Sequence, residues 1–205
     1  MKTCRFCWPL DQKNKSLLLK QSKNFYIMVS IGPMAESFLL LCSKKHYSSC
    51  GNLPSGLYSE FNSLKKEIKD IFTKVYDGYT FFEHGKIKGC CSQNGDSAHC
   101  FHAHLQALPV GMNILPQLIT RLGNPIEISS HQEIIKVIKE TPYLYYETSK
   151  GAYVWPAPLN LEQQFFRMVL ARQLKIPQKV ANWKVTPDWE KAKAIQKKLN
   201  LYFNS

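Results

Sequence analysis

Apolar residues recur with two different periods along this chain of 205 residues. Between residues 56 and 75 they are spaced by three or four positions, which is the period of an amphipathic helix. These positions are Leu57, Phe61, Leu64, Ile68, Ile71 and Val75. The segment therefore predicts a long amphipathic helix, which Ser55 caps and Gly78 ends.

Shorter apolar runs predict β-strands before and after this helix. They span residues 24–31, 37–42, 79–83 and 100–110. Because Gly32 and Pro33 separate the first two, we expect them to form an antiparallel pair. The order strand, strand, helix, strand, strand favours an α+β fold built on an antiparallel sheet.

The last part of the chain predicts a hairpin and further helices. The hairpin is expected over residues 143–147 and 152–155, and the helices over 132–139, 161–174 and 188–199. In the first of these helices, Ile134, Ile135 and Ile138 are expected to face inward. Thr186 and Pro187 are expected to start the last one. We therefore expect a core, residues 1–115, and an extension, residues 116–205, that packs on the core.

The composition is that of an ordinary globular protein, with 44% hydrophobic and 20% charged residues. The apolar runs are far shorter than the roughly 18 residues of a membrane span, so no transmembrane segment is expected. Seven cysteines, without the apolar stretch of a secretory signal at the start, indicate a reducing compartment such as the cytoplasm. A net charge of +12, shared equally by the two halves, favours anionic ligands such as nucleotides or RNA.

The stretch HCFHAHLQAL, residues 99–108, places histidines and a glutamine inside an apolar strand. Alternate side chains of a strand share a face, so His102, His104 and Gln106 are expected to project together at steps of about 7 Å. A neutral imidazole offers one nitrogen to a metal or an electrophile while a hydrogen bond holds the other. Ordinary core or surface histidines are the alternative, but a polar, Gly-rich loop at residues 86–99 favours a reactive site.

The motif Cys4-Arg5-Phe6-Cys7 has the spacing at which two thiolates reach one zinc ion. A redox pair has the same spacing, but its thioredoxin-like βαβ context is missing. A tetrahedral zinc ion needs two more ligands, for which His46 and one of the strand histidines are available. The adjacent Cys90 and Cys91 are interpreted as free thiols in a loop.

Taken together, these pieces resemble the histidine triad superfamily. They are CRFC at 4–7, SFLLLCSKKHYSS at 37–49, the long helix, FFEHG at 81–85 and HAHLQALPV at 102–110, in the superfamily's order. The His-x-His-x-Gln version resembles the galactose-1-phosphate uridylyltransferase and diadenosine tetraphosphate phosphorylase branches. Residues 161–184 and the basic segment after them resemble the C-terminal region of CwfJ-like proteins, a branch linked to RNA splicing.

The resemblance implies a role for each matching residue. It implies a structural zinc ion bound by Cys4, Cys7, His46 and His102. It further implies that His104 is the nucleophile that attacks the α-phosphorus of a nucleotide and that Gln106 hydrogen-bonds the phosphate. We expect the loop to contact the substrate through Gln93, Asn94, Ser97 and His99.

Two positions depart from the superfamily's pattern. His99 stands five residues before His104, where a small hydroxyl or backbone donor is common. Ser30 stands where an acidic residue often binds the ribose. The resemblance also implies a homodimer through the long helix and the sheet edge, although the tail is an alternative cover for that surface.

Two functions follow from these observations. The first is an enzyme, a nucleotidyl hydrolase or transferase that works through a covalent nucleotidyl-histidine intermediate on His104. The second is a non-catalytic CwfJ-like module that binds or processes RNA. The presence of a histidine at position 104, the expected nucleophile, favours the enzyme over the non-catalytic module.

Overall fold

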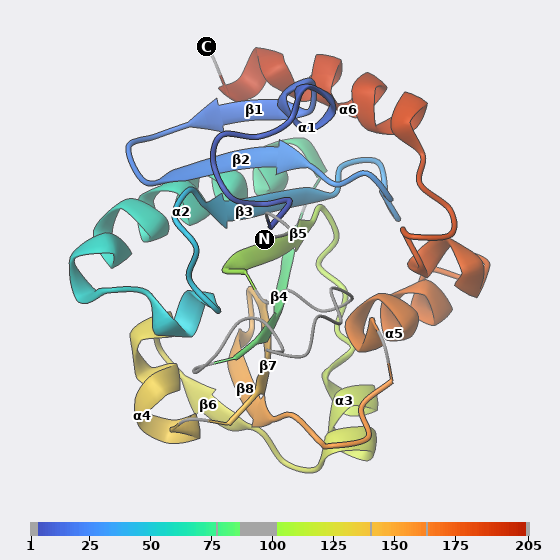
Figure 1. Cartoon of the computed structure of the whole chain (residues 1–205). Coiled ribbons are helices and arrows are strands. Elements are labelled where there is room, and N and C mark those ends of the chain that lie inside the picture. Colours follow the sequence, from blue (N-terminus) through green and yellow to red (C-terminus); the bar gives the residue numbers. More distant parts are fainter. Residues whose placement is uncertain (1–3, 77, 87–101, 140, 163, 204–205) are drawn as a thin grey trace.

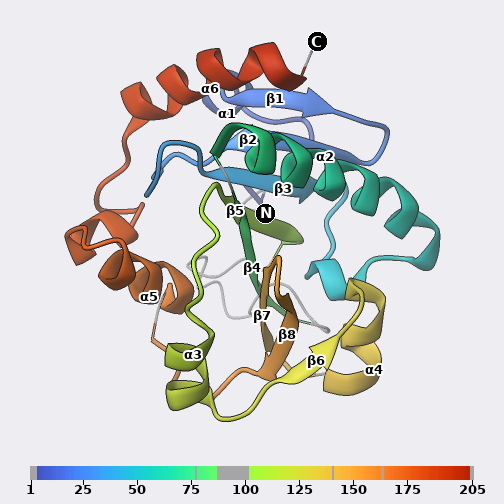
Figure 2. The ribbon, with the colours of Figure 1, turned by 180° about the vertical axis from the view of Figure 1, so that it is seen from behind.

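The structure is a computed structural model that describes residues 4–76, 78–86, 102–139, 141–162 and 164–203. Within these ranges the strands form an eight-stranded sheet in the order β1-β2-β3-β5-β4-β7-β8-β6, with antiparallel neighbours throughout. Helices cover both faces of the sheet (Figures 1 and 2). The predicted α+β class is confirmed.

The strands lie close to the predicted positions and include two that the sequence pattern did not predict, β1 and β6. They are β1 (Leu18–Gln21), β2 (Phe25–Val29), β3 (Leu39–Ser43), β4 (Thr80–Gly85), β5 (His104–Leu108), β6 (Ile126–Ile128), β7 (Tyr143–Thr148) and β8 (Gly151–Pro156). The predicted pair of β2 and β3 and the predicted hairpin of β7 and β8 are confirmed.

The helices are α1 (Gln12–Lys15), α2 (Tyr58–Tyr76), α3 (Leu115–Leu122), α4 (Ile134–Ile138), α5 (Phe165–Gln173) and α6 (Trp189–Phe203). Short 3₁₀ turns lie at η1 (Cys50–Asn52), η2 (Ser55–Leu57), η3 (His131–Glu133) and η4 (Gln178–Ala181). Among the helices of the described ranges, none is long and apolar enough to cross a membrane.

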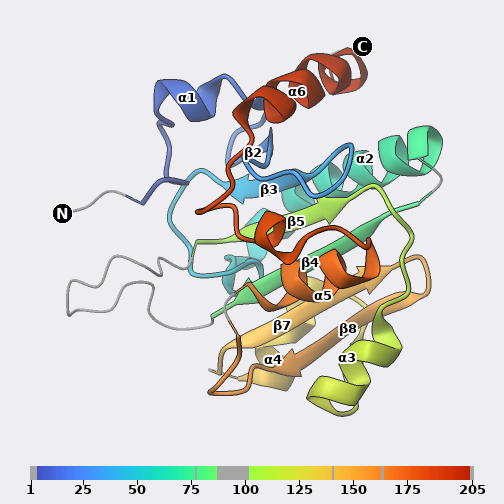
Figure 3. The same ribbon diagram turned by 90° about the vertical axis from the view of Figure 1, so that its right-hand side faces the viewer.

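Helices α2 and α5 lie on opposite faces of the sheet, as Figure 3 shows with α5 in front and α2 behind. The apolar stripe of α2 is buried as predicted, and Phe61 packs on Phe25 of β2. On the other face, Phe166 of α5 packs on Phe82 of β4. This second face also carries the candidate site.

The residues after position 115 extend the same sheet. Strand β7 pairs with β4 along its length, with Phe82 opposite Tyr146. Helix α6 packs on β1 and β2 at the far edge, where Gln196 Nε2 donates to the Leu18 carbonyl at 2.9 Å. The residues after position 115 therefore contact the earlier strands both at β4 and at the β1 edge of the sheet.

Several predicted helix ends were wrong. Ser55 lies in η2 and does not cap α2. The cap of α6 is Asp188, whose carboxylate accepts from the Lys191 amide at 2.9 Å, and not Thr186. Ile135 is 44% exposed, because it lies about 100° around the helix axis from Ile134, which shares the buried face with Ile138.

Strand β5 also begins later than predicted, at His104. His102 therefore lies before the strand, and residues 100 and 101 lie outside the described residues. The alternation expected for an extended strand holds for His104 and Gln106, which are half-buried, whereas Leu105 and Ala107 are buried.

Candidate functional site: a metal-binding cluster beside a histidine cleft

Cys4, Cys7, His46 and His102 come together as the sequence predicts, with ligand atoms that all lie within 4.8 Å of one another. The Nδ1 atoms of His46 and His102 are 3.3 Å apart. The Cys7 Sγ lies 3.1 Å from His46 Nδ1, and the Cys4 Sγ lies 3.5 Å from His102 Nδ1. A tetrahedral zinc ion with bonds of about 2.0–2.3 Å holds its ligand atoms about 3.3–3.8 Å apart, near the spacings seen here, so the two thiols and two imidazoles could hold a metal ion such as zinc.

The hydrogen bonds of His102 leave the required nitrogen available. Its Nε2 lies 2.8 Å from the Ser43 carbonyl, which only accepts, so Nε2 carries the proton and Nδ1 keeps its lone pair. Burial lowers the pKa of His102 to about 4, so the ring is neutral at neutral pH. A neutral imidazole with a free Nδ1 is what metal coordination needs.

His104 lies at the start of β5, opposite Cys42 of β3. Its Nδ1 donates to the His102 carbonyl at 2.6 Å, which leaves Nε2 with the lone pair. Burial lowers the pKa of His104, with the hydrogen bond to His102 acting in the opposite direction. The ring is therefore neutral and oriented, as a nucleophile requires.

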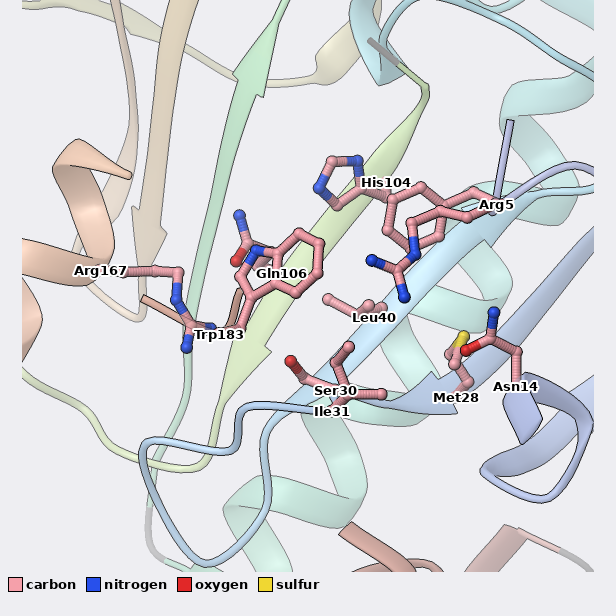
Figure 4. A pocket seen from close by; sticks show the side chains of 11 residues that line it. Arg5, Asn14, Met28, Ser30, Ile31, Leu40, His104, Gln106, Arg167 and Trp183 are labelled. Atoms are coloured by element: carbon pink, nitrogen blue, oxygen red, sulfur yellow. The ribbon is translucent and has the colours of Figure 1, made fainter. Parts of the chain in front are cut away.

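A cleft opens next to His104 and is lined by β2, β3 and β5 (Figure 4). Its floor follows one row of cross-strand neighbours, because Met28 lies opposite Leu40 and Leu40 lies opposite Gln106. His104 and Gln106 share this face of β5, as predicted from the period of two. Ser30, which stands where the resemblance implies an acidic, ribose-binding residue, also lines the cleft.

The two residues between Cys4 and Cys7 cover part of this cleft. The Phe6 ring stacks on the His104 ring, with centroids 5.0 Å apart and an interplanar angle of 17°. Tyr26 fixes this segment, because its hydroxyl donates to the Phe6 carbonyl at 2.7 Å. Arg5 lies over Trp183, which belongs to the segment before α6. No sequence pattern predicts these contacts, since they depend on how the N-terminal segment crosses the sheet.

His84 of β4 is a further residue on this face that the sequence pattern missed. Phe82 lies opposite Gln106, and continuing that register places His84 opposite His104. Its Nε2 is buried with no hydrogen-bond partner among the described residues. Burial is the larger cause that lowers the pKa of His84 to about 4, and the nearby His104 lowers it further. His84 belongs to the segment FFEHG at residues 81–85, but its position beside His104 follows from the β4–β5 register.

The predicted loop contacts Gln93, Asn94, Ser97 and His99 lie outside the described residues, as do Cys90 and Cys91.

Comparisons with known proteins relate the chain to one family. The family described as "Protein similar to CwfJ C-terminal" matches residues 1–120, which include the four residues of the cluster and, in the cleft, His104 and Gln106. CWF19-like protein 1 of Xenopus laevis is 27% identical over 197 residues, covering 88% of this chain and 34% of that protein. The chain thus spans about a third of that relative's length.

Solved structures that resemble the chain share little sequence with it. A galt-like protein from Arabidopsis thaliana is 12% identical, with a TM-score of 0.47 and coverage of 91% of this chain and 93% of that chain. A histidine triad (HIT) family hydrolase from Clostridium thermocellum is 18% identical, with a TM-score of 0.39 and coverage of 56% and 95%.

Proposed function

The chain belongs to the family of proteins similar to the CwfJ C-terminal region, and from this we propose that it is a nucleotidyl hydrolase or transferase that acts through His104. The substrate is a nucleoside phosphate derivative, cleaved at its α-phosphorus. The proposal rests on one observation above the others. The His104 Nδ1 proton is held by the His102 carbonyl, so a neutral Nε2 is available at the cleft.

In the first step, the Nε2 lone pair attacks the α-phosphorus and a nitrogen–phosphorus bond forms. The bond from phosphorus to the leaving group breaks, and that group departs with the electron pair and takes a proton from solvent. The ring carries a positive charge in the intermediate, which the His102 carbonyl stabilises through Nδ1–H. Water or another acceptor then attacks phosphorus, loses its proton, and releases neutral His104.

Gln106 is proposed to bind a non-bridging oxygen of the phosphate, because its side chain shares the face and the cleft with His104. The loop residues Gln93, Asn94, Ser97 and His99 remain predicted substrate contacts. Division of the chain at residue 115, and pairing into a homodimer, also remain predictions.

Cys4, Cys7, His46 and His102 would hold the zinc ion. A zinc ion with four protein ligands supplies a crosslink and has no open position for substrate. The residues themselves then do the positioning: His102 fixes His104 through its carbonyl, and the Cys4–Cys7 segment places Phe6 against the His104 ring.

The test is incubation with nucleotides labelled at the α-phosphate, from three classes: dinucleoside polyphosphates, nucleoside phosphoramidates and nucleotide sugars. We expect acid-labile, base-stable label on the protein, and none on His104→Ala. Gln106→Ala should still become labelled, at a rate about 10- to 100-fold lower. Absence of both label and turnover across the three classes would remove the enzymatic proposal.

A non-catalytic RNA-binding role is the second candidate, favoured by the net charge of +12. It predicts RNA binding that weakens steeply with salt and is unchanged in His104→Ala. Binding measured by fluorescence anisotropy at two salt concentrations separates it from the first candidate.

A further inference from the structure

The wall of the cleft opposite its β-strands comes from the two ends of the chain. The Arg5 guanidinium lies 4.5 Å from the centroid of the Trp183 ring (Figure 4). Trp183 lies outside residues 1–120, the part that the family match covers. The C-terminal part of the chain therefore contributes an aromatic face to a cleft whose reactive residues come from the core.

Trp183 is held firmly in this position. Its backbone packs on Gly32 so closely that a Cβ added at Gly32 would lie 2.5 Å from the Trp183 Cβ. The Arg167 guanidinium joins the two segments, because Nη2 donates to the Gly32 carbonyl at 2.7 Å and Nε donates to the Ala181 carbonyl at 2.6 Å. A ring fixed before binding loses little conformational freedom when a ligand stacks on it.

The lining of the cleft is chemically mixed. His104 and Gln106 are polar, Met28, Ile31 and Leu40 are apolar, and Asn14, Ser30 and Arg167 add further polar groups. Phe6 already uses its ring face on His104. The Trp183 face instead carries a guanidinium, a planar group that stacks on indole much as an aromatic base does.

We propose that Trp183 is the stacking platform for the base of the bound nucleotide, and that Arg5 leaves the indole to pair with the nucleotide's phosphate. This rests on the proposed function, since the α-phosphate is taken to lie at His104. Base stacking on an aromatic ring tolerates any of the bases. Arg5 then has two partners in turn, the indole in the free protein and the phosphate in the complex.

The experiment measures equilibrium binding of three probes to the full chain by calorimetry: AMP, adenosine and ribose 5-phosphate. Trp183→Leu should weaken AMP and adenosine about tenfold or more and leave ribose 5-phosphate within about twofold. Arg5→Ala should instead weaken the binding of AMP and ribose 5-phosphate, the two probes with a phosphate, about tenfold. It should leave the affinity for adenosine within about twofold of the wild type.

Trp189→Leu is the matched control, because Trp189 is also half-buried with a lysine, Lys13, 5.9 Å from its ring, but does not line the cleft. It should bind all three probes as the wild type does. Trp183→Phe keeps a stacking face and should retain binding. AMP should quench tryptophan fluorescence in the wild type and should not quench it in Trp183→Phe. This second variant decides the matter if Trp183→Leu does not fold.

Two results would overturn the stacking platform: wild-type protein that binds AMP no better than ribose 5-phosphate, or a folded Trp183→Leu protein that binds all three probes as the wild type does. Labelling of His104 separates this failure from failure of the proposed function. Normal labelling in Trp183→Leu with an unchanged KM removes the platform alone. Base-dependent binding with no label on His104 removes catalysis alone.

Discussion

Arg167 is a cation with only 4% exposure, and backbone carbonyls make its burial tolerable. Burial lowers its pKa to about 9, so it remains charged at neutral pH. Its guanidinium lies 4.8 Å from the Phe38 ring and donates to the carbonyls of Gly32 and Ala181. One side chain thus joins the turn after β2 to the segment that leads to Trp183.

Replacing this side chain by Arg167→Met should lower the free energy of unfolding by about 2–4 kcal/mol, because two buried carbonyls lose a charged donor. Urea denaturation measures the change. Arg172→Met, at an exposed position of the same helix, should change stability by less than about 0.5 kcal/mol. Equal effects of the two variants would show that the carbonyl contacts of Arg167 contribute little.

His131 is 1% exposed, and neither ring nitrogen has a hydrogen-bond partner among the described residues. Burial, with Lys65 nearby, lowers its pKa well below the usual value. The unfolded chain therefore binds a proton below about pH 6.5 that the folded chain does not, so stability falls as the pH is lowered through this range.

His131→Leu should accordingly flatten the pH dependence of unfolding between about pH 6.5 and 5. The change in slope should approach 1.4 kcal/mol per pH unit, the value for one proton. Chemical denaturation of both proteins at several pH values measures this slope. An unchanged slope would mean that His131 takes up its proton equally in both states.

At the level of elements, the pairing of β4 with β7 depends on Gly85, which lies opposite Tyr143. A Cβ at Gly85 would lie 2.0 Å from the Tyr143 ring, which crosses this position. Tyr143 has little room to move, because its hydroxyl donates to the buried Glu83 at 2.6 Å and accepts from the Gly51 amide at 2.9 Å. The absence of a side chain at Gly85 therefore lets the strands pair.

Gly85→Ala should destabilise the protein by about 3 kcal/mol through this overlap. Gly56→Ala is the matched control, since nothing lies within 4 Å of its added Cβ, and it should be neutral or stabilising by up to about 1 kcal/mol. Thermal unfolding of both variants compares them. A Gly85→Ala protein as stable as the wild type would show that Tyr143 repacks.

The elements with strong local patterns could be predicted from sequence, and those defined by distant partners could not. The stripe of α2 and the apolar runs of β2 and β3 carry their own signal. Strand β6 is three residues long, with Ile126 and Glu127 exposed, so its sequence has little pattern. The pairing of β4 with β7 joins residues more than 50 positions apart, and nothing local specifies it.

The same division holds for the site. The clustering of Cys4, Cys7, His46 and His102 could be predicted, because their residue types and the family resemblance identify them together as candidate metal ligands. Trp183 and His84 could not, because Trp183 reaches the cleft and His84 lies beside His104 through a crossing or a register that only the folded chain defines.

On the scale of the whole molecule, the candidate metal cluster brings the N-terminal segment onto the sheet. This segment places Phe6 on His104 and Arg5 on Trp183, and a bound zinc ion would hold it there. The double variant Cys4→Ser, Cys7→Ser should therefore retain less than half an equivalent of zinc and unfold about 5 °C or more below the wild type. Metal analysis and calorimetry test this, and full zinc retention would contradict the assigned ligands.

The sheet also crosses the proposed boundary at residue 115. In a fragment of residues 1–115, β4 would lose β7 and expose an unpaired edge from Phe81 to Gly85, while Phe82 would lose Phe166 and the adjoining Tyr146. Open, apolar strand edges pair with other chains. We expect this fragment to aggregate or to unfold without cooperativity, whereas the full chain unfolds in one transition. Size-exclusion chromatography and urea denaturation decide, and a monomeric fragment with a cooperative transition would mean that the core folds independently of the strands that extend it.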